Sequence, residues 1–175
     1  MHGDRHENNP RLKSALSLVP SFCFQRWVRW ANGCEIPESS NVFPMTIVIA
    51  DDHAAVRKSL RVMVECEPNL QLIGEASDGL EAIRAVHALQ PDLLLTDIKM
   101  PQMTGLEVLQ YLRNEKNSLG VIILSNHSEP LYVDAAMRLG ANAFVAKASG
   151  LEILMDAIHS VSEGGSFIDP NIKSD

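Results

Sequence analysis

Polar side chains that can hold a metal ion and a phosphoryl group follow four apolar runs of the sequence. The pair Asp51 and Asp52, then Asp97, Ser125 and Lys147 each come directly after such a run. Because the carboxyl ends of parallel strands meet at one edge of an α/β sheet, we expect these groups to converge on one crevice. Three carboxylates, a hydroxyl and an ammonium in one place are suited to binding a divalent cation and a phosphoryl group.

Each of these residues also has an ordinary structural interpretation. An aspartate before a helix is a common N-cap, and Asp52 could serve in this way while also binding metal. An aspartate before a loop, such as Asp97, is a common turn residue. Ser125 alone indicates a loop hydroxyl, and Lys147 alone a surface lysine. The functional interpretation therefore depends on the joint pattern and not on any single residue.

The elements that must position these residues alternate five times between strand and helix from Met45 onward. Apolar runs predict the strands, and helical spacing with Gly, Pro and capping residues predicts the helices. Strands are expected at 46–50, 70–74, 93–96, 121–124 and 143–146, and helices at 54–66, 79–89, around 106–112, 129–139 and after Ser149. Ser149 is expected to cap the last helix, with Glu152 completing a capping box. Strict alternation with short connections predicts an α/β fold with a parallel sheet and right-handed crossovers.

The composition is that of a globular domain without a membrane anchor. The chain has 175 residues, 46% of them hydrophobic, which is enough for one domain with a substantial core. No apolar run approaches the roughly 18 residues of a transmembrane helix. The short apolar stretch at 15–24 contains Pro20 and is followed by Arg26 and Arg29, where a secretion signal has small residues. We therefore expect a cytoplasmic protein with no membrane partner.

The first 44 residues differ from the remainder. They contain both tryptophans, Trp27 and Trp30, show no sustained periodicity, and carry a net charge of +1, which leaves −8 for the rest of the chain. We predict that residues 1–44 are a disordered N-terminal extension; an adaptor arm anchored by the two tryptophans is the alternative. The predicted domain then covers 45–162, and 163–175 form a C-terminal tail or a truncated linker.

Five stretches of the chain closely resemble the receiver domain of bacterial two-component response regulators. They lie at 49–53, 74–79, 97–105, 123–125 and 147–150, and the resemblance covers about residues 45–162. The first helix and the stretch Lys147-Ala148-Ser149 are most similar to the NarL/FixJ-type subfamily. The resemblance implies a flavodoxin-like fold, with a five-stranded parallel sheet in the order 2-1-3-4-5 and helices on both faces.

The resemblance also implies a magnesium site. Asp52 and Asp97 correspond to direct Mg²⁺ ligands, Asp51 to a ligand acting through water, and the backbone carbonyl of Lys99 to a further ligand. The chemistry agrees with this, since Mg²⁺ prefers six oxygens and needs only one or two carboxylates beside phosphate and water. Clustered carboxylates repel one another, and a bound cation relieves that repulsion.

The same resemblance makes Asp97 the phosphoacceptor, phosphorylated by a partner histidine kinase or phosphotransfer protein. Lys147 then neutralises charge on the phosphoryl oxygens, and Ser125 donates a hydrogen bond to one of them. Ser125 and Phe144 correspond to the switch pair of the family, although Phe144 lacks the hydroxyl of a tyrosine. Ala148 stands where many receivers have a proline preceded by a cis peptide, a geometry that costs about 3–4 kcal/mol without proline.

The sequence thus predicts a phosphoacceptor that changes protein–protein contacts and is not a turnover enzyme. The face formed by the fourth helix, fifth strand and fifth helix is expected to bind a partner, or a second copy in a phosphorylation-dependent homodimer. The alternative is the N-terminal receiver of a DNA-binding transcription regulator, because 163–170 resembles the linker to a helix-turn-helix domain that the remaining residues are too few to form. A charge of −8 without a Lys/Arg stripe predicts no nucleic-acid binding by this chain alone. A Mg²⁺-dependent aspartyl-phosphate phosphatase is disfavoured, since Lys99 occupies the position of that class's acid.

Overall fold

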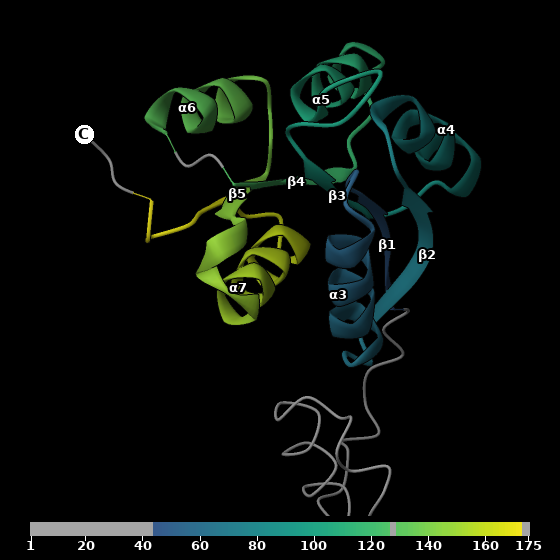
Figure 1. Ribbon diagram of the computed structural model, residues 1–175, viewed down its shortest axis with the longest axis vertical. Helices are drawn as coiled ribbons and strands as arrows, with labels where there is room; N and C mark the ends of the chain where they lie inside the picture. Colours follow the sequence, from purple (N-terminus) through teal and green to yellow (C-terminus); the bar gives the residue numbers. More distant parts are fainter. Residues whose placement is uncertain (1–43, 127–128, 173–175) are drawn as a thin grey trace, which may run out of the picture. The chain divides into compact units, whose positions relative to one another are not determined.

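The computed structural model describes residues 44–126 and 129–172, so the predicted extension at 1–44 lies, except for Pro44, outside the described residues. The described residues form an alternating series of strands and helices (Figure 1). The elements are β1 (Met45–Ala50), α3 (Ala54–Glu65), β2 (Leu70–Ala76), α4 (Gly79–Leu89), β3 (Leu93–Asp97), α5 (Gly105–Asn114), β4 (Gly120–Ser125), α6 (Pro130–Arg138), β5 (Ala143–Ala146), the 3₁₀ turn η2 (Lys147–Ser149), α7 (Leu151–Ser162) and β6 (Phe167–Ile168).

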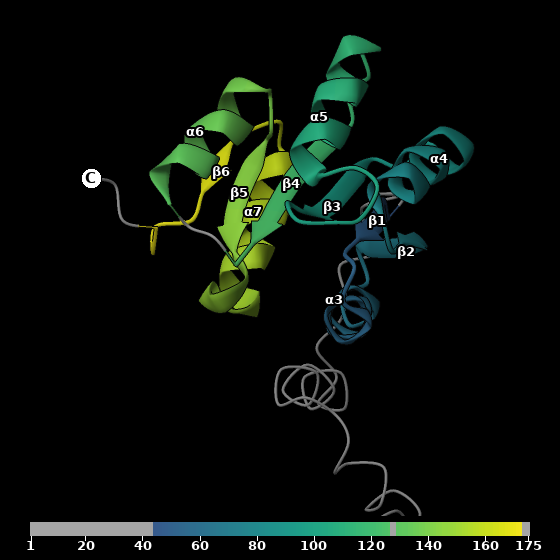
Figure 2. The same cartoon turned by 45° about the horizontal axis from the view of Figure 1, so that its top comes forward.

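The strands of the described residues form a single parallel sheet in the order β2-β1-β3-β4-β5-β6. The predicted fold class and the order of the first five strands are therefore confirmed. The expectation of five strands was one short, because β6 pairs with β5 at the edge of the sheet (Figure 2). This strand comprises only two residues, too few to show the periodicity by which a strand is recognised in a sequence.

Helices cover both faces of the sheet. In Figure 1, α4, α5 and α6 lie on one face, whereas α3 and α7 lie on the other. A hydrophobic core lies on each face of the sheet. Strand β3 is buried along its whole length, with Leu94 in the core under α4, α5 and α6 and Leu93 and Leu95 in the core under α3 and α7. Burial on both sides explains its unbroken apolar run, the usual pattern of a central parallel strand.

The described helices begin with different local devices. Asp78 caps α4 by accepting a hydrogen bond from the backbone N–H of Glu81. The predicted cap of α7 by Ser149 was wrong, because Gly150 occupies the N-cap position with φ +86° and no side chain caps the helix. Ser149 belongs instead to the 3₁₀ turn η2. Within the part of the chain described here, no helix has the length and apolar character needed to cross a membrane.

Candidate functional site

The carboxyl ends of the strands bring the predicted site residues to one edge of the sheet. Asp51 follows β1, Asp97 ends β3, Ser125 ends β4, and Lys147 follows β5. The parallel register carries this alignment across the sheet, pairing Asp97 with Leu124 and the next residue, Ser125, with the end of β5. Four residues that are far apart in the sequence therefore meet at one place.

Lys147 joins two buried carboxylates at the centre of the site. Its Nζ atom lies 2.5 Å from Oδ2 of Asp51 and 3.0 Å from Oδ2 of Asp97. All three side chains are at least nine-tenths buried, so the attraction between them is screened less than at a surface. The ammonium offsets the repulsion that two adjacent carboxylates would otherwise exert on each other.

Backbone N–H groups fix the orientation of the same two carboxylates. Oδ1 of Asp51 accepts a hydrogen bond from the N–H of His53 at 2.8 Å, and Oδ1 of Asp97 accepts one from the N–H of Ile98 at 2.8 Å. In each carboxylate one oxygen is therefore held by the local backbone and the other faces Lys147. The site is fixed by the loops that follow β1 and β3 as much as by the strands.

Asp52 and His53 form the exposed side of the site. The Asp52 side chain is 32% exposed, and its Oδ1 lies 2.5 Å from Nδ1 of His53. His53 occupies the N-cap position of α3 with its ring 62% exposed. Ligand atoms of Asp51, Asp52, His53 and Asp97 all lie within 4.8 Å of one another. Since most of these donors are carboxylate oxygens, which hard cations prefer, the residues present fit a Mg²⁺ ion.

The loop between β3 and α5 is held close to Asp97 by two glycines. A Cβ atom on Gly105 would lie only 2.0 Å from the carbonyl oxygen of Asp97, and one on Gly79 would lie 2.2 Å from that of Met103. A larger residue at either position would push this loop away from the site. Lys99 lies in the same loop with its side chain exposed, and the role of its carbonyl as a metal ligand remains a prediction.

Arg57 is a site residue that the sequence analysis missed. Its Nη1 donates to the carbonyl oxygen of Asp51 at 2.6 Å, and its Nε lies 3.6 Å from Oε2 of Glu75 at the end of β2. Arg61, one turn further along α3, lies 2.6 Å from Oε1 of the same Glu75. The signal was present in the sequence, because two arginines one turn apart follow the aspartate pair and a glutamate comes directly after the expected second strand at 70–74. These contacts tie the first turns of α3 and the end of β2 to the backbone of Asp51.

The predicted switch residues are both buried. Ser125 is buried at the end of β4, where the register places it beside Ala146. Phe144 is fully buried in the core that includes Val133 and Ala136 of α6. The structure thus shows the aromatic ring in a packed position, and its role as a switch remains a prediction.

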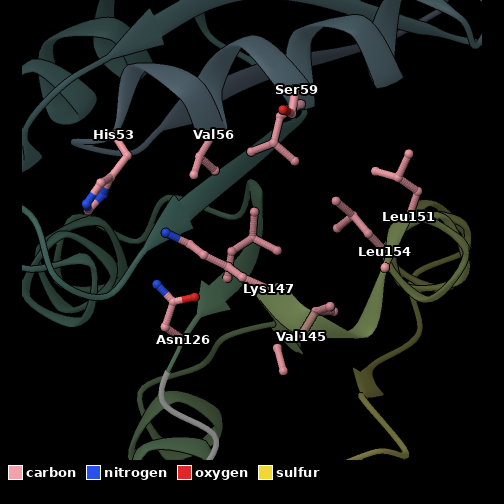
Figure 3. A pocket seen from close by; sticks show the side chains of 12 residues that line it. His53, Val56, Ser59, Asn126, Val145, Lys147, Leu151 and Leu154 are labelled. Carbon is pink, nitrogen blue, oxygen red and sulfur yellow. The ribbon is translucent and has the colours of Figure 1, made fainter. Parts of the chain in front are cut away.

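A cavity of about 490 Å³ opens beside the site, between α3 and α7. Figure 3 shows the Lys147 side chain extending from the end of β5 towards His53 and Asn126 at one end of this cavity. Most of the other lining residues are apolar, among them Val56, Leu60, Leu124, Val145, Leu151 and Leu154.

The fold and the residues at its carboxyl edge define a response regulator receiver domain. The family model for this domain matches residues 47–159, so the chain belongs to the response regulator receiver family. Among the curated relatives, the chain is 36% identical over 127 residues to the nitrate/nitrite response regulator protein NarL of Escherichia coli K12 and 33% identical over 128 residues to the transcriptional regulatory protein UhpA of Salmonella typhimurium. These alignments cover 71% and 73% of this chain but 58% and 64% of the two relatives. The chain therefore spans only part of the length of the relatives it matches.

Solved structures support the same family and subfamily. The isolated receiver domain of RcsB from Salmonella enterica, determined with a phosphomimetic BeF₃⁻, gives a TM-score of 0.70 at 26% identity and covers 74% of this chain and 96% of that chain. The receiver domain of the NarL homologue from Mycobacterium tuberculosis gives a TM-score of 0.67 at 30% identity, covering 69% and 98%. The predicted resemblance to NarL-type receivers is confirmed.

Proposed function

We propose that this receiver is a phosphoacceptor of a two-component relay and that Asp97 carries the phosphoryl group. The observation that carries the proposal is the placement of Lys147, whose ammonium lies within 3.0 Å of Asp97 and also contacts Asp51. A cation held against the accepting carboxylate is what the transfer of a negatively charged phosphoryl group requires. The partner is a histidine kinase or phosphotransfer protein, and a cytoplasmic location follows from this partnership.

The transfer is an exchange of one phosphorus bond for another. A carboxylate oxygen of Asp97 forms a bond to phosphorus as the phosphorus–nitrogen bond of the partner's phosphohistidine breaks, and the released imidazole takes up a proton. The Lys147 ammonium balances charge on the transferring oxygens, and the Ser125 hydroxyl donates a hydrogen bond to one of them. Asp52, Asp97 and the backbone carbonyl of Lys99 would hold a Mg²⁺ ion directly and Asp51 would hold it through water, and the ion would supply additional charge neutralisation.

The output of the switch is a change in protein contacts. The new acyl phosphate carries about −1.5 to −2 charges and draws Ser125 towards it, which alters the packing next to Phe144. The affected face lies over α6, β5 and α7, and it binds a partner or a second copy of the chain. Several relatives are named as transcriptional regulators and extend beyond the aligned region. The second candidate function is therefore that of the receiver part of a DNA-binding regulator.

The proposal is tested by phosphorylating the protein with a small phosphodonor and Mg²⁺. Intact-mass spectrometry is expected to show one phosphoryl addition on the wild type and none on Asp97→Asn. Asp156→Asn, which removes an exposed aspartate of α7, serves as the matched control and is expected to be labelled like the wild type. Persistent labelling of Asp97→Asn at another aspartate would overturn the assignment.

A further inference from the structure

Asp169 is a buried carboxylate that the proposed transfer does not use. It follows β6 directly and is 1% exposed. Its backbone N–H donates to the carbonyl oxygen of Phe144 at 2.9 Å and so continues the pairing of β6 with β5. Buried carboxylates are costly unless donors surround them, so its partners should reveal what it does.

The partners of the Asp169 side chain lie on both sides of Lys147. Oδ2 accepts a hydrogen bond from the N–H of Ala146 at 3.0 Å, and the Ser149 side chain also donates to this carboxylate. Oδ1 accepts from the N–H of Asn171 at 2.8 Å. Burial acts to raise the pKa of Asp169, but the hydrogen bonds from Ser149, Asn171 and Ala146 outweigh it and hold the pKa below its ordinary value. The carboxylate is therefore matched to donors on the turn that carries Lys147.

That turn has few other constraints of its own. Ala148 follows Lys147 without the ring that fixes φ in proline. Within the described residues no peptide bond is cis, so the Lys147–Ala148 bond is trans. Neither the 3₁₀ turn nor the following helix has a side-chain cap, and Gly150 begins that helix. Gly150 does little to keep the turn ordered, because glycine regains more backbone freedom on unfolding than any other residue.

We propose that Asp169 is a positioning residue that holds Lys147 at the phosphoryl site through Ala146 and Ser149. The ammonium must span from β5 to Asp51 and Asp97, and a shift of its backbone by about 1 Å would break contacts of 2.5 and 3.0 Å. Asp169 holds that backbone from the edge of the sheet, where β6 lies beside β5. The inference rests on the proposed function, since it assigns a purpose to the position of Lys147.

The same contacts connect the site with the C-terminal segment. Asp169 contacts the Lys147 turn through its side chain and Phe144 through its backbone. The Asp169 side chain therefore links β6 to the turn that carries Lys147, in addition to the backbone pairing of β6 with β5.

Graded variants of the full chain test the proposal. Both Asp169 oxygens accept from backbone N–H groups, so Asp169→Asn must turn its NH₂ towards a donor and lose one bond, whereas Asp169→Ala loses all of them. Ser149→Ala removes only the side-chain donor. The rate of phosphorylation by a small donor is expected to fall about tenfold in Asp169→Ala, less in Asp169→Asn and least in Ser149→Ala. Asp156→Asn on α7 is the charge-matched control and should leave the rate unchanged.

A double-mutant cycle separates positioning from general damage to the fold. If Asp169 acts through Lys147, Asp169→Ala adds no further loss when Lys147 is already alanine. An equal fold-change in both backgrounds would overturn the proposal, as would a wild-type rate in Asp169→Ala. If Asp169→Ala does not melt cooperatively, the same cycle is run with Asp169→Asn.

A spectroscopic measurement keeps this proposal distinct from the proposed function. The NMR signal of the Lys147 ammonium is assigned by its loss in Lys147→Ala. In the wild type its chemical shift should differ from that of exposed lysines. In both Asp169 variants its chemical shift should move towards the value of exposed lysines. An unchanged signal would contradict positioning even if phosphorylation occurs. If the signal moves while the wild type accepts no phosphoryl group at Asp97, the proposed function fails and the positioning role stands.

Discussion

Asp51 and Asp52 are neighbours in the chain, but their environments differ sharply. The first directly follows β1, and its side chain is buried against Lys147. The second is partly exposed and contacts the exposed His53 ring. One aspartate is therefore committed to an internal ion pair, whereas the other faces solvent. This difference supports separate roles in metal binding.

Asp52→Ala is expected to weaken Mg²⁺ binding more than Asp51→Ala does. Asp52 is proposed to ligate the ion directly and Asp51 through water, so the direct contact carries more Coulomb attraction. We expect a loss of about tenfold in affinity, or about 1.4 kcal/mol, for Asp52→Ala and a smaller loss for Asp51→Ala. Isothermal titration calorimetry measures both, with the exposed Asp134→Asn as control. Equal affinities in the two alanine variants would contradict the roles.

At the scale of the elements, α5 is the helix whose start is best defined. Thr104 and Glu107 form a capping box in which the Thr104 N–H and hydroxyl both donate to Glu107, each at 2.8 Å. The backbone hydrogen bond from Thr104, followed by that from its hydroxyl, holds the pKa of Glu107 below its usual value of 4.5. This helix begins directly after the loop that follows Asp97, so its first turn supports the site.

Glu107→Gln is expected to lower the melting temperature at neutral pH but not in acid. Because the folded-state pKa is depressed, the charged form stabilises the fold above about pH 4.5, and this contribution is lost as the pH falls through the lower folded-state value. The melting temperatures of the wild type and of Glu107→Gln, measured between pH 3 and 7, should therefore converge at the acid end. Glu152→Gln in the first turn of α7 controls for the loss of one charge. A difference that persists at pH 3 would contradict this role of the carboxylate.

The sequence predicted correctly those elements that are determined by residues close together in the chain. The bounds of β5, Ala143–Ala146, were predicted correctly because its apolar run is flanked by polar residues. The cap by Ser149 was wrong because a carboxylate twenty residues further along the chain competes for its hydroxyl. The site residues were predicted from their places at strand ends and from family resemblance. Arg57 and Asp169 were not, since the contact of Arg57 with Glu75 and the contacts of Asp169 with Ala146 and Ser149 join elements that only the fold brings close.

At the scale of the whole molecule, the C-terminal segment belongs to the folded unit. A chain ending at Ser162 lacks β6 and Asp169 and loses at least the bonds from Phe167 to Asn142, from Asp169 to Phe144 and from Ala146 to Asp169. At about 1 kcal/mol each, we expect a destabilisation of about 2–4 kcal/mol relative to the full chain. Urea unfolding of the two chains measures the difference, and coincident midpoints would show that the segment is a loose tail.

The charge of the molecule predicts its behaviour towards nucleic acid. The full chain carries −7, and the part from Met45 onward carries −8. Since clustered cations supply most non-specific affinity for DNA, we expect no gel shift of random duplex at low salt. A micromolar shift that fades with added salt would contradict this expectation, and removal of residues 1–44 would then show whether that segment binds.

Strand β6 also determines which sheet edge is exposed to other protein molecules in a concentrated solution. Without β6, the border of the sheet is Ala143-Phe144-Val145-Ala146, an apolar segment of strand-forming residues with unpaired backbone groups. Such a border is a template on which another chain can add its own strand and so begin an aggregate. A covering strand of two residues closes this template and is itself too short to offer a new one. Two residues that contribute little to the core therefore cover a sheet edge that would otherwise be open to strand addition.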